Sequence, residues 1–228
     1  MGSGLRIDRP DLYSGNLPVY NSGMADGYHH GNLRAAVLER AARVIAEKGP
    51  YGFSLRSLAA DLGVSHTAPR HHFGGREGVL NALATEGFTE LAERLRVNRE
   101  ARGGFLEAGV VYVGFATDFP AHFTVMFEPS LLDQDDAELN AARTAAFGEL
   151  RSGVESLAEE GREVADAPAA VVAGWSIVHG LATLALTGNL DGSGVRELFG
   201  DADLPTITRR GAGLLFGPSG PPPDNEAE

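Results

Sequence analysis

Side chains that can bind a nucleic acid are concentrated in the stretch Ser54–Phe73, which reads SLRSLAADLGVSHTAPRHHF. Arginine, histidine and threonine side chains can donate hydrogen bonds to base edges, such as guanine N7 and O6, and to phosphate oxygens. If a helix starts after Ser65, four such side chains fall within an arc of about 140° on its surface. They are His66, Thr67, Arg70 and His71. The free amides at the start of that helix also favour a phosphate group, so the stretch is a candidate nucleic-acid surface.

The elements that must position these side chains are two short helices joined by a tight turn. Ser54 suits the N-cap of the first helix, and Gly63 can adopt a left-handed turn conformation. Ser65 can cap a second helix that ends near Phe73. Pro69 then falls at the fourth helical position, where it forfeits one hydrogen bond to the Ser65 carbonyl at tolerable cost. This is the build of a helix-turn-helix, whose second helix enters the major groove, but a helical hairpin that only packs has the same build.

The formal charge is divided unevenly along the chain. The whole sequence has a net charge of −12, which by itself argues against a polyanionic partner. Residues 28–76 nevertheless hold seven Lys and Arg against three acids, together with five of the seven histidines, whereas residues 77–228 hold ten Arg against 25 acids. A polyanion would therefore be attracted to the first segment and repelled by the second. A solvated basic face on an ordinary helical domain would give the same counts.

Hydrophobic residues recur at helical spacing through most of the chain, and no stretch alternates convincingly as a strand would. We expect a helix over 33–48, with Asn32 as N-cap and Gly49 after its end, and another over about 76–99. Further helical stretches are expected at Gly104–Phe119, Pro120–Leu132, Asp136–Glu160, Ala169–Leu190 and Leu204–Phe216, with a loop at Asp191–Asp201 that holds a short helical turn at Val195–Phe199. The predicted fold class is all-α. Residues 1–27 are expected to be a flexible arm, and residues 217–228 a disordered tail.

Several kinds of chemistry lack the residues that they need. The chain has no cysteine, which excludes a disulfide scaffold, a Cys-based zinc site and Cys-based catalysis. It lacks a G-x-x-x-x-G-K-[ST] phosphate loop and a G-x-S-x-G nucleophile elbow. The pairs His29-His30 and His71-His72 are adjacent rather than four apart, so we expect no metal site. We predict no catalytic residues, no cofactor and no enzyme activity, and the lack of a visible secretory signal favours a cytoplasmic location.

The stretch Ala169–Leu190 contains 22 residues and no formal charge. A membrane helix needs about 20 apolar residues, so its length permits a membrane span. Its polar residues, its three glycines and the lack of a flanking basic cluster instead favour a helix buried in a core and a subunit interface. We expect no membrane partner.

The run from Tyr28 to Leu83 resembles the DNA-binding domain of the tetracycline-repressor (TetR) family. The resemblance is carried by a helix that ends in E-K-G, then by F-S-L-R-S-L-A-x-x-L-G-V-S and by H-H-F-x-x-[KR]-E-x-x-L. Two later stretches, Pro120–Leu131 and Ala173–Leu190, resemble the C-terminal domain of a subgroup named for a Trp-His-Gly signature. The signature residues in this chain are Trp175, His179 and Gly180, which are not contiguous.

The resemblance implies a three-helix DNA-binding domain at residues 28–76 and a helical ligand-binding and dimerisation domain at 77–216, whose last two long helices form the dimer interface. It makes Arg56, His66, Thr67 and Arg70 the expected base readers, and Ser54, His72 and Arg76 the expected contacts to the sugar-phosphate backbone. The family usually has Thr-Leu-Tyr where this chain has Ala68-Pro69-Arg70. The common tyrosine contact is therefore replaced by an arginine, which leaves the operator sequence open.

Aromatic residues of the second domain can wall an apolar ligand cavity. Ordinary core packing would use the same residue types. The candidate ligand-binding residues are Phe105, Tyr112, Phe115, Phe123, Phe127, Trp175 and His179.

We therefore expect a homodimeric, ligand-responsive transcriptional regulator, most simply a repressor, that binds a near-palindromic double-stranded DNA operator and is released by a largely apolar small molecule. One alternative is a helical small-molecule-binding protein or enzyme that keeps the scaffold without reading DNA. A second is an interaction module that works through Ala169–Leu190. Titration of duplex binding against salt separates the first two hypotheses, and a strict monomer in light scattering would argue against both the first and the third.

Overall fold

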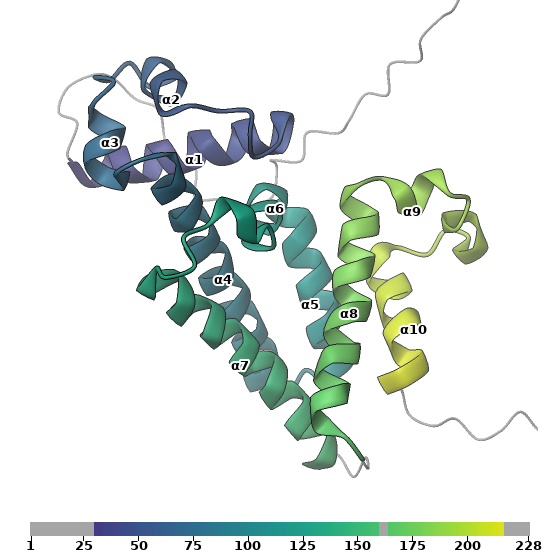
Figure 1. The fold of residues 1–228 in the computed structure, drawn as a ribbon. Helices are drawn as coiled ribbons and strands as arrows, with labels where there is room; N and C mark the ends of the chain where they lie inside the picture. Colours follow the sequence, from purple (N-terminus) through teal and green to yellow (C-terminus); the bar gives the residue numbers. More distant parts are fainter. Residues whose placement is uncertain (1–29, 160–163, 217–228) are drawn as a thin grey trace, which may run out of the picture.

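The computed structural model describes residues 30–159 and 164–216, and all regular structure in these residues is helical (Figure 1). The elements are α1 (His30–Lys48), α2 (Leu55–Asp61), α3 (Ala68–Phe73), α4 (Arg76–Glu100), α5 (Phe105–Asp118), α6 (Pro120–Met126), η1 (Pro129–Leu131), α7 (Ala137–Glu159), α8 (Ala167–Leu186), α9 (Asn189–Gly192), η2 (Arg196–Phe199) and α10 (Leu204–Phe216). The all-α prediction is confirmed. The predicted arm at 1–27 and tail at 217–228 lie outside the described residues.

Helices α1, α2 and α3 form a small bundle at one end of the molecule, against the beginning of α4 (Figure 1). Val37 of α1, Leu58 of α2 and Leu80 of α4 have no more than a trace of solvent exposure and form the centre of this bundle. Each buried aliphatic side chain of this kind contributes roughly 1.5–3 kcal/mol to folding. An ion pair between Arg40 of α1 and Asp61 of α2, at 2.9 Å, fixes the two helices at their surface.

Helix α4 connects this bundle to the rest of the molecule. It runs from α3 to the far end of the structure and packs along α7 (Figure 1). Helix α5 packs against α4, α7 and α8, and α10 covers the outer sides of α5 and α8. The main hydrophobic core extends from α1 to α8, and a smaller one joins Phe105 to Val154, Leu157 and Phe216. Helix α4 therefore contacts α3 at its beginning and the helices of the second half of the molecule along the rest of its length.

The predicted helices at 104–119, 120–132, 136–160 and 204–216 are confirmed as α5, α6 with η1, α7 and α10. Gly49 follows α1 in the left-handed region at φ 77°, as expected of a residue after a helix end. Asn32 is not an N-cap, because α1 already begins at His30.

The charge-free stretch Ala169–Leu190 is not one continuous helix. Helix α8 begins earlier, because the carboxylate of Asp166 caps it by accepting a hydrogen bond from the Ala169 amide at 3.0 Å. It ends earlier as well, because Gly188 turns the chain at φ 71° and Leu190 belongs to α9. Hydropathy alone did not reveal this break.

The Phe115→Ala variant is expected to lower the free energy of unfolding by about 3–5 kcal/mol, since Phe115 is fully buried in the main core and its removal leaves a cavity. Chemical denaturation measures this loss. Leu198→Ala is the matched control, because Leu198 is 80% exposed and its truncation should cost less than about 0.5 kcal/mol. Equal losses in the two variants would contradict the packing described above.

Candidate nucleic-acid interface and ligand cavity

Helix α2 begins at a complete capping box. The Ser54 hydroxyl accepts a hydrogen bond from the Ser57 amide, and the Ser57 hydroxyl accepts one from the Ser54 amide, both at 3.1 Å. The predicted N-cap at Ser54 is therefore confirmed, with serine in the place where glutamate is common. The cap leaves Arg56 in the first turn of the helix with its side chain exposed.

Helix α3 starts later than the spacing predicted. Thr67, not Ser65, is the N-cap residue, and His66 and Thr67 lie in the turn before the helix. The Ser65 hydroxyl lies 2.9 Å from that of Thr67 and accepts a long hydrogen bond from the Thr67 amide at 3.4 Å, so it supports the turn before the helix. This start places Pro69 in the first helical turn, where no intrahelical amide bond is required, so the predicted loss of one hydrogen bond is wrong. Pro69 is buried and anchors the start of α3.

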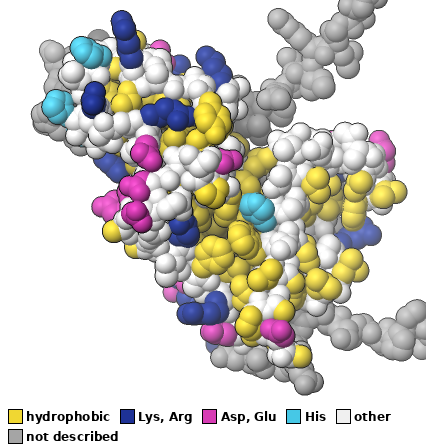
Figure 2. Space-filling model, viewed as in Figure 1, with side chains coloured by type: hydrophobic (Ala, Val, Ile, Leu, Met, Phe, Trp, Pro, Cys, Tyr) yellow, Lys and Arg dark blue, Asp and Glu magenta, His cyan; other side chains and the backbone are white. Residues whose placement is uncertain are grey.

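The structure brings most of the predicted DNA-binding residues to the same end of the molecule. The exposed ones are Ser54, Arg56, His66, Thr67, Arg70 and His72. Among the described residues, neither Arg56 nor Arg70 has an ion-pair partner, so both guanidinium groups can donate hydrogen bonds to a phosphate or a base edge. Figure 2 shows Lys, Arg and His side chains gathered on the end that carries α1, α2 and α3.

Arg76 is the exception among these candidates. Its guanidinium group donates a hydrogen bond to the Pro50 carbonyl and lies over the rings of Tyr51 and Phe53, at 5.5 and 5.1 Å from the ring centres. It therefore fastens the beginning of α4 to the loop after α1. In this arrangement Arg76 stabilises the bundle and is less available to a phosphate than Arg56 or Arg70.

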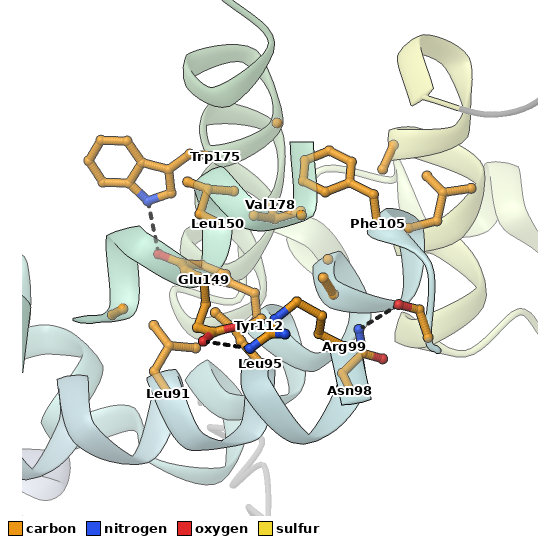
Figure 3. A pocket seen from close by; sticks show the side chains of 18 of the residues that line it. Leu91, Leu95, Asn98, Arg99, Phe105, Tyr112, Glu149, Leu150, Trp175 and Val178 are labelled. Carbon is orange, nitrogen blue, oxygen red and sulfur yellow. Dashed lines mark hydrogen bonds and ion pairs between the residues drawn. The ribbon is translucent and has the colours of Figure 1, made fainter. Parts of the chain in front are cut away.

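A cavity with about 70 Å³ of free space lies in the second half of the molecule, between α4, α5, α7, α8 and α10 (Figure 3). Its wall is mostly aliphatic and aromatic. Four of the predicted ligand-binding residues line it, namely Phe105, Tyr112, Phe127 and Trp175. Phe115 and Phe123 are instead buried in the core, and His179 lies behind Tyr112 rather than along the wall.

Sequence reasoning missed the polar residues of this cavity. Arg99 of α4 and Glu149 of α7 both line it, and Arg99 Nε and Nη2 donate to the two carboxylate oxygens of Glu149 at 2.9 and 3.2 Å. Asn98 of α4 also lines it and donates to the Gly103 carbonyl at 3.2 Å. Arg99 and Glu149 are 50 positions apart, so no local pattern indicates that they meet.

Comparisons with known proteins agree with this geometry. Residues 37–83 match a family described as bacterial regulatory proteins, tetR family, and residues 105–202 match the tetracyclin repressor-like C-terminal domain. A solved protein of unknown function from Rhodococcus sp. RHA1 is 30% identical, with a TM-score of 0.69 over 84% of this chain and 97% of its own. The chain belongs to the TetR family.

Two further relatives carry informative names. The HTH-type transcriptional repressor AcnR of Corynebacterium glutamicum is 38% identical over 86 residues, which are 37% of this chain and 46% of AcnR. The chain thus aligns with about half the length of the curated relatives that it matches. A bacterial regulatory protein of the TetR family from Rhodococcus RHA1 has a TM-score of 0.63 at 21% identity, over 80% of this chain and 94% of that one, and shows the fold alone.

A short hydrogen-bonded chain lies beside the cavity of this TetR-family protein. Trp175 Nε1 donates to the Tyr112 hydroxyl at 3.2 Å (Figure 3). That hydroxyl also lies 2.9 Å from His179 Nδ1. An indole can only donate, so the Tyr112 hydroxyl accepts from Trp175 and keeps its own proton to donate, which His179 Nδ1 accepts when the imidazole is neutral with its proton on Nε2. Burial raises the pKa of Tyr112 and lowers the pKa of His179, so both groups stay neutral around pH 7.

His179 is expected to make the folded protein less stable as the pH falls. Its pKa is lower in the folded state than the unfolded value of about 6.5, so the unfolded chain binds more protons once the pH drops through that value. His179→Asn keeps an acceptor for the Tyr112 hydroxyl and does not titrate. Denaturant midpoints at pH 7.5 and 5.5 should therefore differ less in His179→Asn than in the wild type. An unchanged difference would contradict this role of His179.

Proposed function

We propose that this chain is a ligand-responsive, DNA-binding transcriptional regulator, and specifically a repressor that binds a near-palindromic operator as a homodimer. The observation that carries the proposal is the exposed set on the helix-turn-helix of a TetR-family chain, in which Arg56 and Arg70 have no ion-pair partner among the described residues. We assign DNA binding to residues 28–76 and regulation to residues 77–216. An intracellular, cytoplasmic location and the lack of an enzyme activity follow from that role.

The second copy is proposed to cover α8 and α10. Helix α8 is long and apolar enough to cross a membrane by length and composition alone. Only 17% of its most apolar window is buried within one chain, so most of this apolar surface is left for a partner to cover. Val172 and Leu184 of α8 are 60% and 44% exposed, and Leu214 and Leu215 of α10 are 87% and 63% exposed. Figure 2 shows hydrophobic side chains spread over this side of the molecule. A two-fold pair of helix hairpins buries such a surface.

Coupling between ligand and DNA is proposed to pass through α4. Leu91, Leu95 and Arg99 of α4 line the cavity, and the same helix begins directly after α3. A ligand that binds more tightly when α4 lies in one of two placements favours that placement. The shift of α4 then changes the separation of the two α3 helices in the dimer. Such coupling is typically worth 1–3 kcal/mol.

Titration of duplex binding against salt tests the proposal. The affinity for a duplex should fall steeply as salt rises, because Arg and Lys contacts release counterions from the phosphates. A control with the Arg56→Ala, Arg70→Ala double variant should show weaker binding and a shallower slope. Absence of binding to any duplex at low salt would favour the alternative, a helical small-molecule-binding protein on the same scaffold.

A further inference from the structure

The polar side chains that line the cavity are all hydrogen-bonded to other protein groups. They are Asn98, Arg99, Tyr112, Glu149, Ser156 and Trp175. Asn98 and Ser156 donate to the carbonyls of Gly103 and Gly153, and Trp175 donates to the Tyr112 hydroxyl. Each of these groups already has a hydrogen-bond partner within the protein, so none is an unpaired buried polar group that a polar ligand would have to satisfy. The remaining lining residues are glycines and hydrophobic residues.

Charge is balanced in the same way. Among the described residues that line the cavity, Arg99 and Glu149 are the only charged ones, and they are joined by two hydrogen bonds (Figure 3). The Glu149 side chain is 18% exposed, whereas that of Arg99 is 44% exposed. A ligand carboxylate that paired with Arg99 in place of Glu149 would leave the more buried Glu149 without a counter-charge. A ligand ammonium that paired with Glu149 would displace Arg99 from it. Binding a ligand of either charge therefore carries a desolvation penalty.

The narrowness of the cavity limits the size of the occupant. Its free space of about 70 Å³ is well below the roughly 300–1,000 Å³ of sites for drug-sized ligands. The Phe105 ring also fills part of the space between α7 and α8. A Cβ added at Gly153 or Gly174 would lie 3.0 or 2.8 Å from that ring. The free space therefore accommodates part of a slender alkyl chain, with the rest of the chain outside it, rather than a bulky molecule.

We propose that the cavity binds a small, slender, uncharged apolar molecule, and that the Arg99–Glu149 pair excludes charged molecules of the same shape. The regulatory meaning of this site rests on the proposed function, but the binding itself can be measured without DNA.

Three probes with the same eight-carbon chain test the charge rule: 1-octanol, octanoate and octylamine. Trp175 is the single tryptophan of the chain and lines the cavity, so its fluorescence reports occupancy there. We expect wild-type full-length protein to bind 1-octanol at least about tenfold more tightly than either charged probe. Equal or tighter binding of octanoate or octylamine, or no response to any probe, would overturn the proposal.

Two variants reverse the charge rule in opposite directions. Glu149→Gln leaves Arg99 without its partner and should increase the affinity for octanoate at least about tenfold. Arg99→Gln leaves Glu149 without its partner and should increase the affinity for octylamine at least about tenfold. Glu155→Gln is the matched control, because it removes one carboxylate from α7 at a residue that does not line the cavity. If one variant fails to fold, the other tests the same rule with the opposite charge. Unchanged probe preferences in a folded variant would contradict the role of the pair.

The failure of this inference can be distinguished from failure of the proposed function. If 1-octanol binds with the expected charge preference and the protein binds no duplex, the ligand inference stands and the proposed function fails. If the protein binds duplex DNA and the charged probes bind as well as 1-octanol, the proposed function stands and the ligand inference fails.

Discussion

Replacing Val172 with glutamate is expected to weaken dimerisation at least about 100-fold and to abolish tight duplex binding. Val172 is 60% exposed on α8, within the face that we propose to be covered by a second copy. Two-fold symmetry places the substitution in the interface twice, and each buried carboxylate would lack a counter-charge. Sedimentation or light scattering measures the change in mass, and duplex titration measures its consequence.

Val97→Glu is the matched control for this experiment. Val97 is also an exposed valine, at 51%, but it lies on α4 rather than on α8 or α10. It should leave the dimer intact. A dimeric Val172→Glu protein, or a wild-type chain that is monomeric at micromolar concentration, would show that α8 is not the interface.

Arg70→Ala is expected to lower the affinity for the preferred duplex by about 1–3 kcal/mol, or roughly 5–150-fold. Arg70 is exposed on α3, and its guanidinium group can form two parallel hydrogen bonds to guanine O6 and N7. A base contact of this kind also predicts relaxed sequence preference at one position of each half-site. Binding curves with the preferred duplex and with single-base variants of it measure both effects.

Arg151→Ala controls for the loss of one positive charge. Arg151 is exposed on α7, far from α3 along the chain, and is expected to change duplex affinity only slightly. Equal losses in Arg70→Ala and Arg151→Ala would reduce the role of Arg70 to general electrostatics. Unchanged affinity in Arg70→Ala would remove Arg70 from the set of base readers.

Periodic hydrophobic residues were sufficient to predict most helices, because a helix that buries one face must repeat apolar residues every three or four positions. The ends of the helices were less predictable. The start of α3 depends on the turn that Ser65 and Thr67 form together and on the preference of Pro69 for the first helical turn. The break after α8 depends on one glycine, Gly188, that looks unremarkable within an apolar stretch.

The residues of the DNA-binding site could be predicted from the sequence better than the residues of the cavity. The DNA-binding candidates lie close together in the chain, so local spacing already brought Arg56 and Arg70 to one region. The cavity is built from five helices, and whether an aromatic residue lines it or lies behind it depends on tertiary packing. Phe127 and Phe123 illustrate this, since both are on or next to α6 but only Phe127 lines the cavity. The Arg99–Glu149 pair could be recognised only once α4 and α7 were seen side by side.

Selection of bound sequences from a random duplex pool by the full-length protein tests the central claim most directly. The account predicts enrichment of a near-palindrome whose half-sites are separated centre to centre by about 34–36 Å, one turn of DNA, or by a multiple of it. It also predicts that the Arg56→Ala, Arg70→Ala double variant enriches no such sequence from the same pool. Failure of the wild-type protein to enrich any duplex at low salt would contradict the account.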